Sequence, residues 1–129
     1  MIRCLLAVAL VALLPGAAWA CLPGFEGTEQ SRNNGVTIAY KSQPAPIPVG
    51  QPFALEIAVC PAPRALEVDA HMPAHRHGMN YRPSITNPAP GLYRAEGLVL
   101  HMPGEWEFVF EVGLPSGARQ RLTSPHLAQ

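Results

Sequence analysis

The sequence predicts an all-β fold. Fifteen prolines and eleven glycines among 129 residues leave little room for long helices, because each proline removes a backbone donor and blocks the preceding helical turn. In several segments apolar and polar residues alternate with a period of two, which is typical of half-buried strands. Turn residues separate these segments at short intervals. Strands joined by tight turns are therefore favoured over helical or mixed architectures.

The clearest strand covers residues 53–59, where large apolar side chains alternate with small or charged ones. Residues 91–96 begin another strand, which is interrupted at Gly97 and ends at His101. Six or seven short strands at such spacing predict one immunoglobulin-like β-sandwich. The predicted strands are 36–40, 53–59, 66–72, 98–102, 106–112 and 118–122.

The first twenty residues have the pattern of a secretory signal. A short positive start at 1–3 precedes an unbroken apolar run at 4–14, and small residues at Ala18 and Ala20 occupy the positions that signal peptidase reads. Eleven apolar residues are too few for a membrane-spanning helix, which needs about 20. We therefore expect residues 1–20 to be cleaved, with no transmembrane anchor and a periplasmic or secreted product.

Cleavage leaves 109 residues, enough for one domain with one core. We expect an N-terminal segment at 21–33 and a sandwich at 34–124. Because Arg3 leaves with the signal, eight Lys and Arg face nine Asp and Glu, a formal charge of −1. That balance predicts no long-range attraction to nucleic acid or to anionic lipid.

Two cysteines, Cys21 and Cys60, remain after signal removal, and thiols tend to pair in an oxidising compartment. The predicted strand directions place both at the same end of the sandwich, so a disulfide is favoured. The alternative is a lipid on Cys21 as the new N-terminus. Residues 18–20 make a poor lipidation signal, because the third residue before the cysteine is usually leucine and Trp19 is bulky.

Four of the five histidines, and all three methionines that remain after signal removal, fall between positions 71 and 102. Thioether sulfur favours Cu(I) and imidazole serves Cu(I), Cu(II) and Zn(II), so this mixture predicts copper before zinc. His75 and His77 share a loop with Gly78 and can turn toward one ion. The predicted topology brings the strand ends at Met72 and Met102 to one pole, which adds donors from a second segment.

A purely structural interpretation stands beside this one. Met72 and Met102 have the inward parity of their strands and could be core methionines. His71 and His101 have outward parity and could be surface residues. Arg76, between the two loop histidines, would repel a cation.

Other features favour structure over chemistry. Trp106 is interpreted as a core anchor because of the area that an indole buries, and His126 as unrelated to the cluster. The sequence shows no nucleophile with a matching base, no paired carboxylates at a plausible site and no glycine-rich phosphate loop. An enzyme is therefore not predicted, although an open coordination position on copper would permit redox chemistry.

Three stretches, VDAHMPAHRHGM at 68–79, GLYRAEGL at 91–98 and MPGEWEF at 102–108, resemble the YtkA-like and FixH-type domains of bacterial envelopes. The likeness covers residues 34–122. It implies a small immunoglobulin-like sandwich, often found with copper handling, copper resistance or cytochrome oxidase assembly. FixH-type proteins usually keep a transmembrane anchor, and Arg76 stands where glycine is common. The positions that the resemblance carries over as metal ligands are Met72, His75, His77, Met79, His101 and Met102.

The sequence thus predicts a periplasmic copper-binding or copper-transfer protein, with copper ion and a membrane-bound acceptor or oxidase assembly component as partners. The alternative is a binding module without metal. In that case the same pole docks onto a membrane complex such as cytochrome oxidase during its assembly.

Overall fold

The computed structural model describes residues 21–25 and 28–129, and all regular secondary structure in them is β-strand. The predicted signal peptide, 1–20, lies outside the described residues. The described part of the chain contains no helix long and apolar enough to cross a membrane. The strands are β1 (Glu29–Asn33), β2 (Val36–Gln43), β3 (Phe53–Cys60), β4 (Ala65–Met72), β5 (His77–Gly78), β6 (Ser84–Ala89), β7 (Leu92–Leu98), β8 (Gly104–Gly113) and β9 (Arg119–Ala128).

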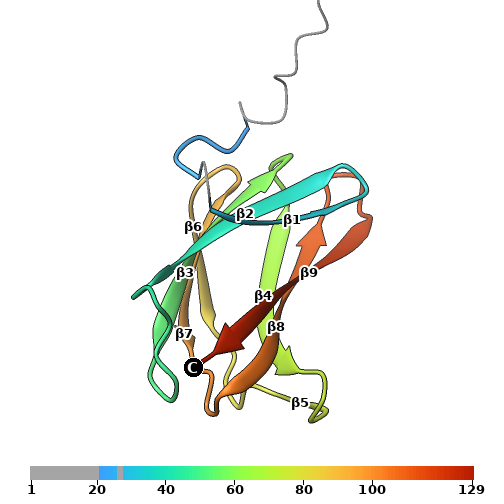
Figure 1. Cartoon of the computed structure of the whole chain (residues 1–129). Helices are drawn as coiled ribbons and strands as arrows, with labels where there is room; N and C mark the ends of the chain where they lie inside the picture. The colour runs from blue at the N-terminus through green and yellow to red at the C-terminus, as the bar shows by residue number, and fades with distance from the viewer. Residues whose placement is uncertain (1–20, 26–27) are drawn as a thin grey trace, which may run out of the picture.

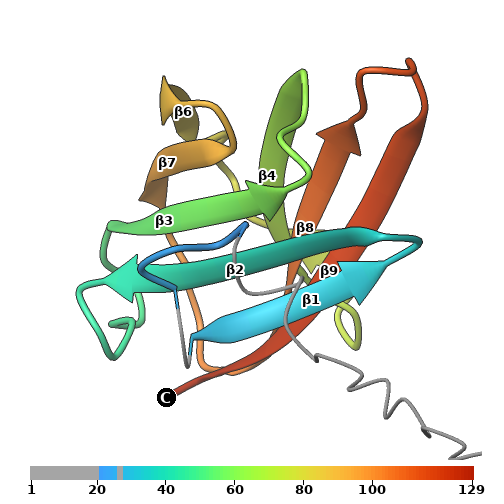
Figure 2. The same ribbon diagram turned by 90° about the horizontal axis from the view of Figure 1, so that it is seen from above.

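These strands form a sandwich of two sheets (Figures 1 and 2). One sheet has the order β1-β2-β3-β7-β6 and the other β5-β4-β8-β9, and the neighbouring strands in both sheets are antiparallel. The all-β sandwich prediction is confirmed. The described residues hold nine strands rather than six or seven, because β1, β5 and β6 are added to the predicted set.

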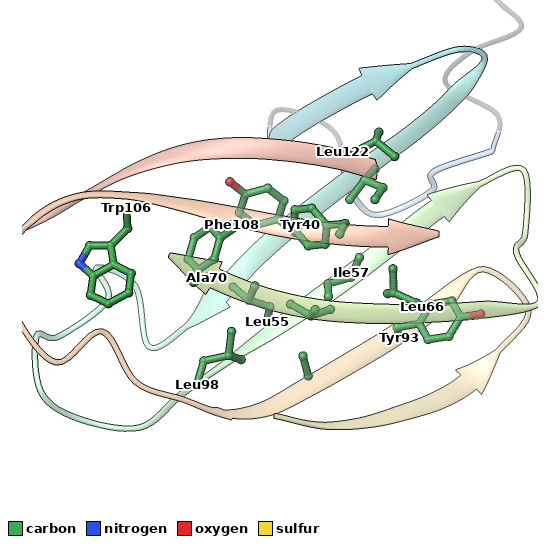
Figure 3. Close-up of a cluster of buried hydrophobic side chains, with 14 of the residues drawn as sticks. Tyr40, Leu55, Ile57, Leu66, Ala70, Tyr93, Leu98, Trp106, Phe108 and Leu122 are labelled. Atoms are coloured by element: carbon green, nitrogen blue, oxygen red, sulfur yellow. The ribbon is translucent and has the colours of Figure 1, made fainter. Parts of the chain in front are cut away.

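The inward faces of both sheets build one continuous core. On β3 and β8 the large apolar side chains stand at every second position and are buried, as the alternating sequences predict. Trp106 lies at one end of this core and Tyr93 at the other (Figure 3). The largest fully buried side chains are Trp106, Phe108, Phe110, Ile38, Leu55, Ile57, Met72, Leu98, Leu100, Leu122, Val36 and Val112.

The two open sides of the sandwich are protected differently. On one side β1 runs beside β9, where Ser31 Oγ donates a hydrogen bond to the Thr123 carbonyl at 2.8 Å and Asn33 Nδ2 to the Arg121 carbonyl at 3.1 Å. On the other side β5 covers only the last two residues of β4. Further along that edge the Asp69 carboxylate accepts the Ala70 N–H at 2.8 Å, so a side chain satisfies this backbone donor.

The N-terminal segment is fixed to the outer face of the five-stranded sheet. The predicted bridge between Cys21 and Cys60 is present, with Cα atoms 5.8 Å apart. Leu22 and Phe25 pack over Ala39 and Ala58 in a second small apolar cluster. A bridged sulfur is not free to carry a lipid, so the structure favours the disulfide over a lipidated cysteine.

The strand predicted to end at His101 stops earlier. β7 ends at Leu98, and residues 99–103 form a connection to β8. The reason is Gly97, with a φ of 82°, which forms a bulge opposite the Phe53/Ala54 step and ends the regular pairing. The connection stays anchored, because Leu100 is buried and its carbonyl accepts the Gly50 N–H at 2.8 Å. His101 therefore lies in a loop rather than on a strand.

Candidate metal centre

Two segments distant in sequence meet at one end of the sandwich, which we call the histidine pole. It comprises the β4–β5 loop (73–76), β5 and the β7–β8 connection (99–103), all at the lower end of Figure 1. The β4–β5 loop is a tight turn, in which the His75 N–H donates to the Met72 carbonyl at 3.1 Å and Arg76 has a φ of 53°. The prediction that the strand ends near Met72 and Met102 share a pole is confirmed.

The side chain of His77 faces the interior of this pole. His77 pairs directly with Met72 across the β4–β5 ladder, and such partners place their side chains on the same face of a sheet. Met72 is only 1% exposed, so that face is the inner one. The Nδ1 atom of His77 is buried and has no hydrogen-bond partner among the described residues. An unpartnered buried nitrogen is costly, and a bound ligand would satisfy it.

The three imidazoles of the pole lie close together. The ring centroids of His77 and His101 are 5.1 Å apart, and those of His75 and His77 are 5.6 Å apart. With a metal–nitrogen distance of about 2.0–2.1 Å, two imidazoles on one ion at tetrahedral or trigonal angles have ring centroids about 5.2–5.5 Å apart. Both observed separations, 5.1 and 5.6 Å, lie within about 0.1 Å of that range, so both pairs are close to the spacing of two ligands on a shared ion.

The imidazoles do not converge on one point in the described conformation. Across residues 21–25 and 28–129, no group of three His, Cys, Asp or Glu side chains is arranged to hold a metal ion. His75 and His101 are exposed, so rotation of their side chains meets little packing resistance. A complete set of metal ligands would need rotation of these histidine side chains, a thioether sulfur as an additional ligand, or both.

The three methionines of the pole differ in burial. Met79 and Met102 are partly buried at the margin of the core, and the Met79 N–H donates to the Ala70 carbonyl at 3.1 Å, which continues the β5 pairing. Met72 is packed in the core, and a Cβ added to Gly104 would lie 2.8 Å from its Cε atom. Of the two interpretations of Met72, packing residue or ligand, its burial favours the first. Met79 and Met102 are the sulfur donors nearest to solvent.

Trp106 also belongs to this pole. The sequence predicts it only as a core anchor. Its indole is 1% exposed and forms edge contacts with His101, at 5.3 Å between centroids, and with His77, at 6.1 Å. Its Nε1–H donates to the Met102 carbonyl at 3.0 Å. The only signal in the sequence was the short Met-Pro-Gly-x-Trp spacing, which returns the chain to the pole within one turn.

The remaining histidines lie elsewhere. His71 is on the outer face of β4, where its Nε2 atom is 3.7 Å from a Glu107 carboxylate oxygen on the neighbouring strand. His126 is on β9 and packs against Phe108, with ring centroids 5.4 Å apart. Burial lowers the pKa of His126, and the nearby Glu29 carboxylate partly opposes that effect. Neither residue contributes to the cluster, as predicted for His126.

A shallow groove of about 440 Å³ adjoins the pole on the outer face of β8 and β9. Leu127, which is 57% exposed, forms part of its apolar lining, and two glutamates lie at its margin. Its lining residues are Pro73, Ala74, Glu105, Trp106, Glu107, Pro125, His126 and Leu127.

Comparisons with known proteins bear on the fold. No family model and no curated protein matches the sequence. A crystal structure of a DUF4426 family protein from Pseudomonas aeruginosa is similar, with a TM-score of 0.54 and 9% sequence identity, over 77% of this chain and 94% of that one. At that identity the likeness shows a shared β-rich fold alone.

Proposed function

We propose that this chain is a periplasmic copper-binding or copper-transfer protein, as its resemblance to YtkA-like and FixH-type domains implies. The observation that carries the proposal is the His77–His101 pair, with ring centroids 5.1 Å apart and a buried, unpartnered Nδ1 atom on His77. No hydrogen bond within the described part of the chain accounts for that nitrogen, whereas a metal ion would.

The available donors suit copper. His77, His101 and His75 supply imidazole nitrogen, and Met79 and Met102 supply soft sulfur, a combination that favours copper over Mg²⁺ or Ca²⁺. Two of the imidazoles are exposed, so an acceptor could replace them one at a time. Such an arrangement is suited to transfer rather than to permanent storage.

The test compares two double variants of the mature protein. His77→Ala with His101→Ala removes the central pair, whereas His71→Ala with His126→Gln removes two histidines that lie outside the cluster. We expect the first to lower Cu(I) affinity by more than about 100-fold, since changes that only support a ligand already cost 10–100-fold. The control should retain wild-type affinity. Wild-type protein that binds Cu(I) and Cu(II) no tighter than about micromolar would refute the proposal.

The groove beside the pole supports the second candidate, a docking module that needs no metal. Leu127 is one of two large apolar side chains that the described residues expose, and it lies next to the β4–β5 loop. Binding of the protein to solubilised cytochrome oxidase, measured with wild type and with His75→Ala combined with His77→Ala, separates the candidates. Undiminished binding by the variant in the absence of copper favours docking.

A further inference from the structure

The indole of Trp106 closes the inner side of the imidazole cluster. It contacts His77 and His101 edge to face, with interplanar angles of 72° and 86°, and it is 1% exposed. The apolar core lies beyond it, and Figure 3 shows Trp106 at the left with the core side chains to its right. Water has no access to the cluster from that side, and the indole carbons offer no lone pair to an ion.

Trp106 also forms a hydrogen bond with a backbone carbonyl oxygen, which is a possible metal ligand. Its Nε1–H hydrogen bonds to the carbonyl of Met102, which follows His101 directly. The bond fixes the connection that carries both residues. It also engages the carbonyl oxygen of the residue that follows His101, and carbonyl oxygen suits harder ions than Cu(I).

From this geometry we infer that Trp106 sets the ion selectivity of the site in favour of Cu(I) over Cu(II) and Zn(II). The inference rests on the proposed function and specifies Cu(I) as the ion that the site binds. Cu(II) prefers four or more ligands in a tetragonal arrangement and Zn(II) prefers four in a tetrahedron. A site closed on one side by an indole limits coordination to the outer side, where two imidazoles and a thioether suffice for Cu(I). A cation held over an indole face within about 6 Å of the ring centroid is also attracted to the ring.

The experiment uses the mature chain, in which Trp106 is the sole tryptophan because Trp19 belongs to the predicted signal. Ag(I), a redox-inert probe for the Cu(I) site, is titrated while tryptophan fluorescence is recorded. Cu(I), Cu(II) and Zn(II) affinities are then measured by competition for wild type and for Trp106→Phe, with Tyr93→Phe at the far end of the core as control. We expect Ag(I) to quench the emission and to saturate at one equivalent.

For Trp106→Phe we expect Cu(I) and Ag(I) affinities about tenfold weaker, because phenylalanine binds cations less well and lacks the N–H group. Cu(II) and Zn(II) affinities should be unchanged or tighter. An equal loss for all ions would show that Trp106 acts only by packing, and would overturn this inference while leaving the proposed function intact.

Two further outcomes are decisive. Should Trp106→Phe fail to fold, the wild-type titration still discriminates, because Ag(I) binding without any change in emission excludes contact between indole and ion. Absence of binding by every ion refutes the proposed function and this inference with it.

Discussion

Replacing Gly104 with alanine should strain the junction between the β7–β8 connection and β8. Gly104 has a φ of 129°, where side chains are rarely tolerated, and the added Cβ would lie 2.8 Å from the Met72 Cε atom. The backbone term is about 1–3 kcal/mol. Met72 is a flexible side chain but is 1% exposed in a packed core, so moving it costs a further 1–3 kcal/mol or so.

Gly97 provides the matched control. It has a φ of 82° with nothing within 4 Å of an added Cβ, so Gly97→Ala has backbone strain without the contact. We expect Gly104→Ala to lower the free energy of unfolding by about 1–3 kcal/mol more than Gly97→Ala does. Urea denaturation at constant m-value measures the difference, and each 1 kcal/mol corresponds to about 4–8 °C in Tm. Equal destabilisation of the two variants would show that Met72 does not pack against Gly104.

Three further predictions concern ligands, the disulfide and pH. Met72→Leu conserves volume, so it should cost less than about 1.5 kcal/mol and leave Cu(I) affinity unchanged, and a lost Cu(I) signal in competition titrations would identify Met72 as a ligand. Replacing Cys21 and Cys60 together by serine opens a link across 39 residues and should lower the free energy of unfolding by about 3–4 kcal/mol; guanidinium denaturation checks this, and an unchanged midpoint would contradict it. Because burial lowers the pKa of His126 below its ordinary value of about 6.5, the unfolded chain binds the proton more readily, and stability should fall as pH drops below about 6.5. Thermal melts of His126→Gln should show a weaker acid dependence, and an identical one would refute this assignment.

The sequence predicts the strands that bury a face. Phe53–Cys60 and Gly104–Gly113 contain large apolar residues at every second position, so their period is visible without any tertiary information. β1, with the sequence EQSRN, has no buried residue, and β6 contains three exposed polar residues and Pro88. These edge strands form because they pair with neighbouring strands, and a local sequence pattern does not reveal that pairing.

The candidate site was predicted in part for a related reason. The clustering of His75 and His77 with a second segment followed from composition and strand direction. The loop position of His101 did not, because the bulge at Gly97 depends on pairing with β3. The area that an indole buries assigns Trp106 to the core, but it does not reveal that the indole also contacts two imidazoles.

The exposed edge of β4 bears on how the protein behaves at high concentration. The unpaired N–H and C=O groups of an edge strand can pair with a strand of a second molecule, which is a common route to aggregation. Here the carboxylate of Asp69 holds the Ala70 N–H, and Glu67 brings a second negative charge to the same stretch. An incoming strand would have to displace the Asp69 carboxylate from the Ala70 N–H and to lie beside the charge of Glu67. Self-association through this edge is thereby disfavoured without a covering strand along its whole length.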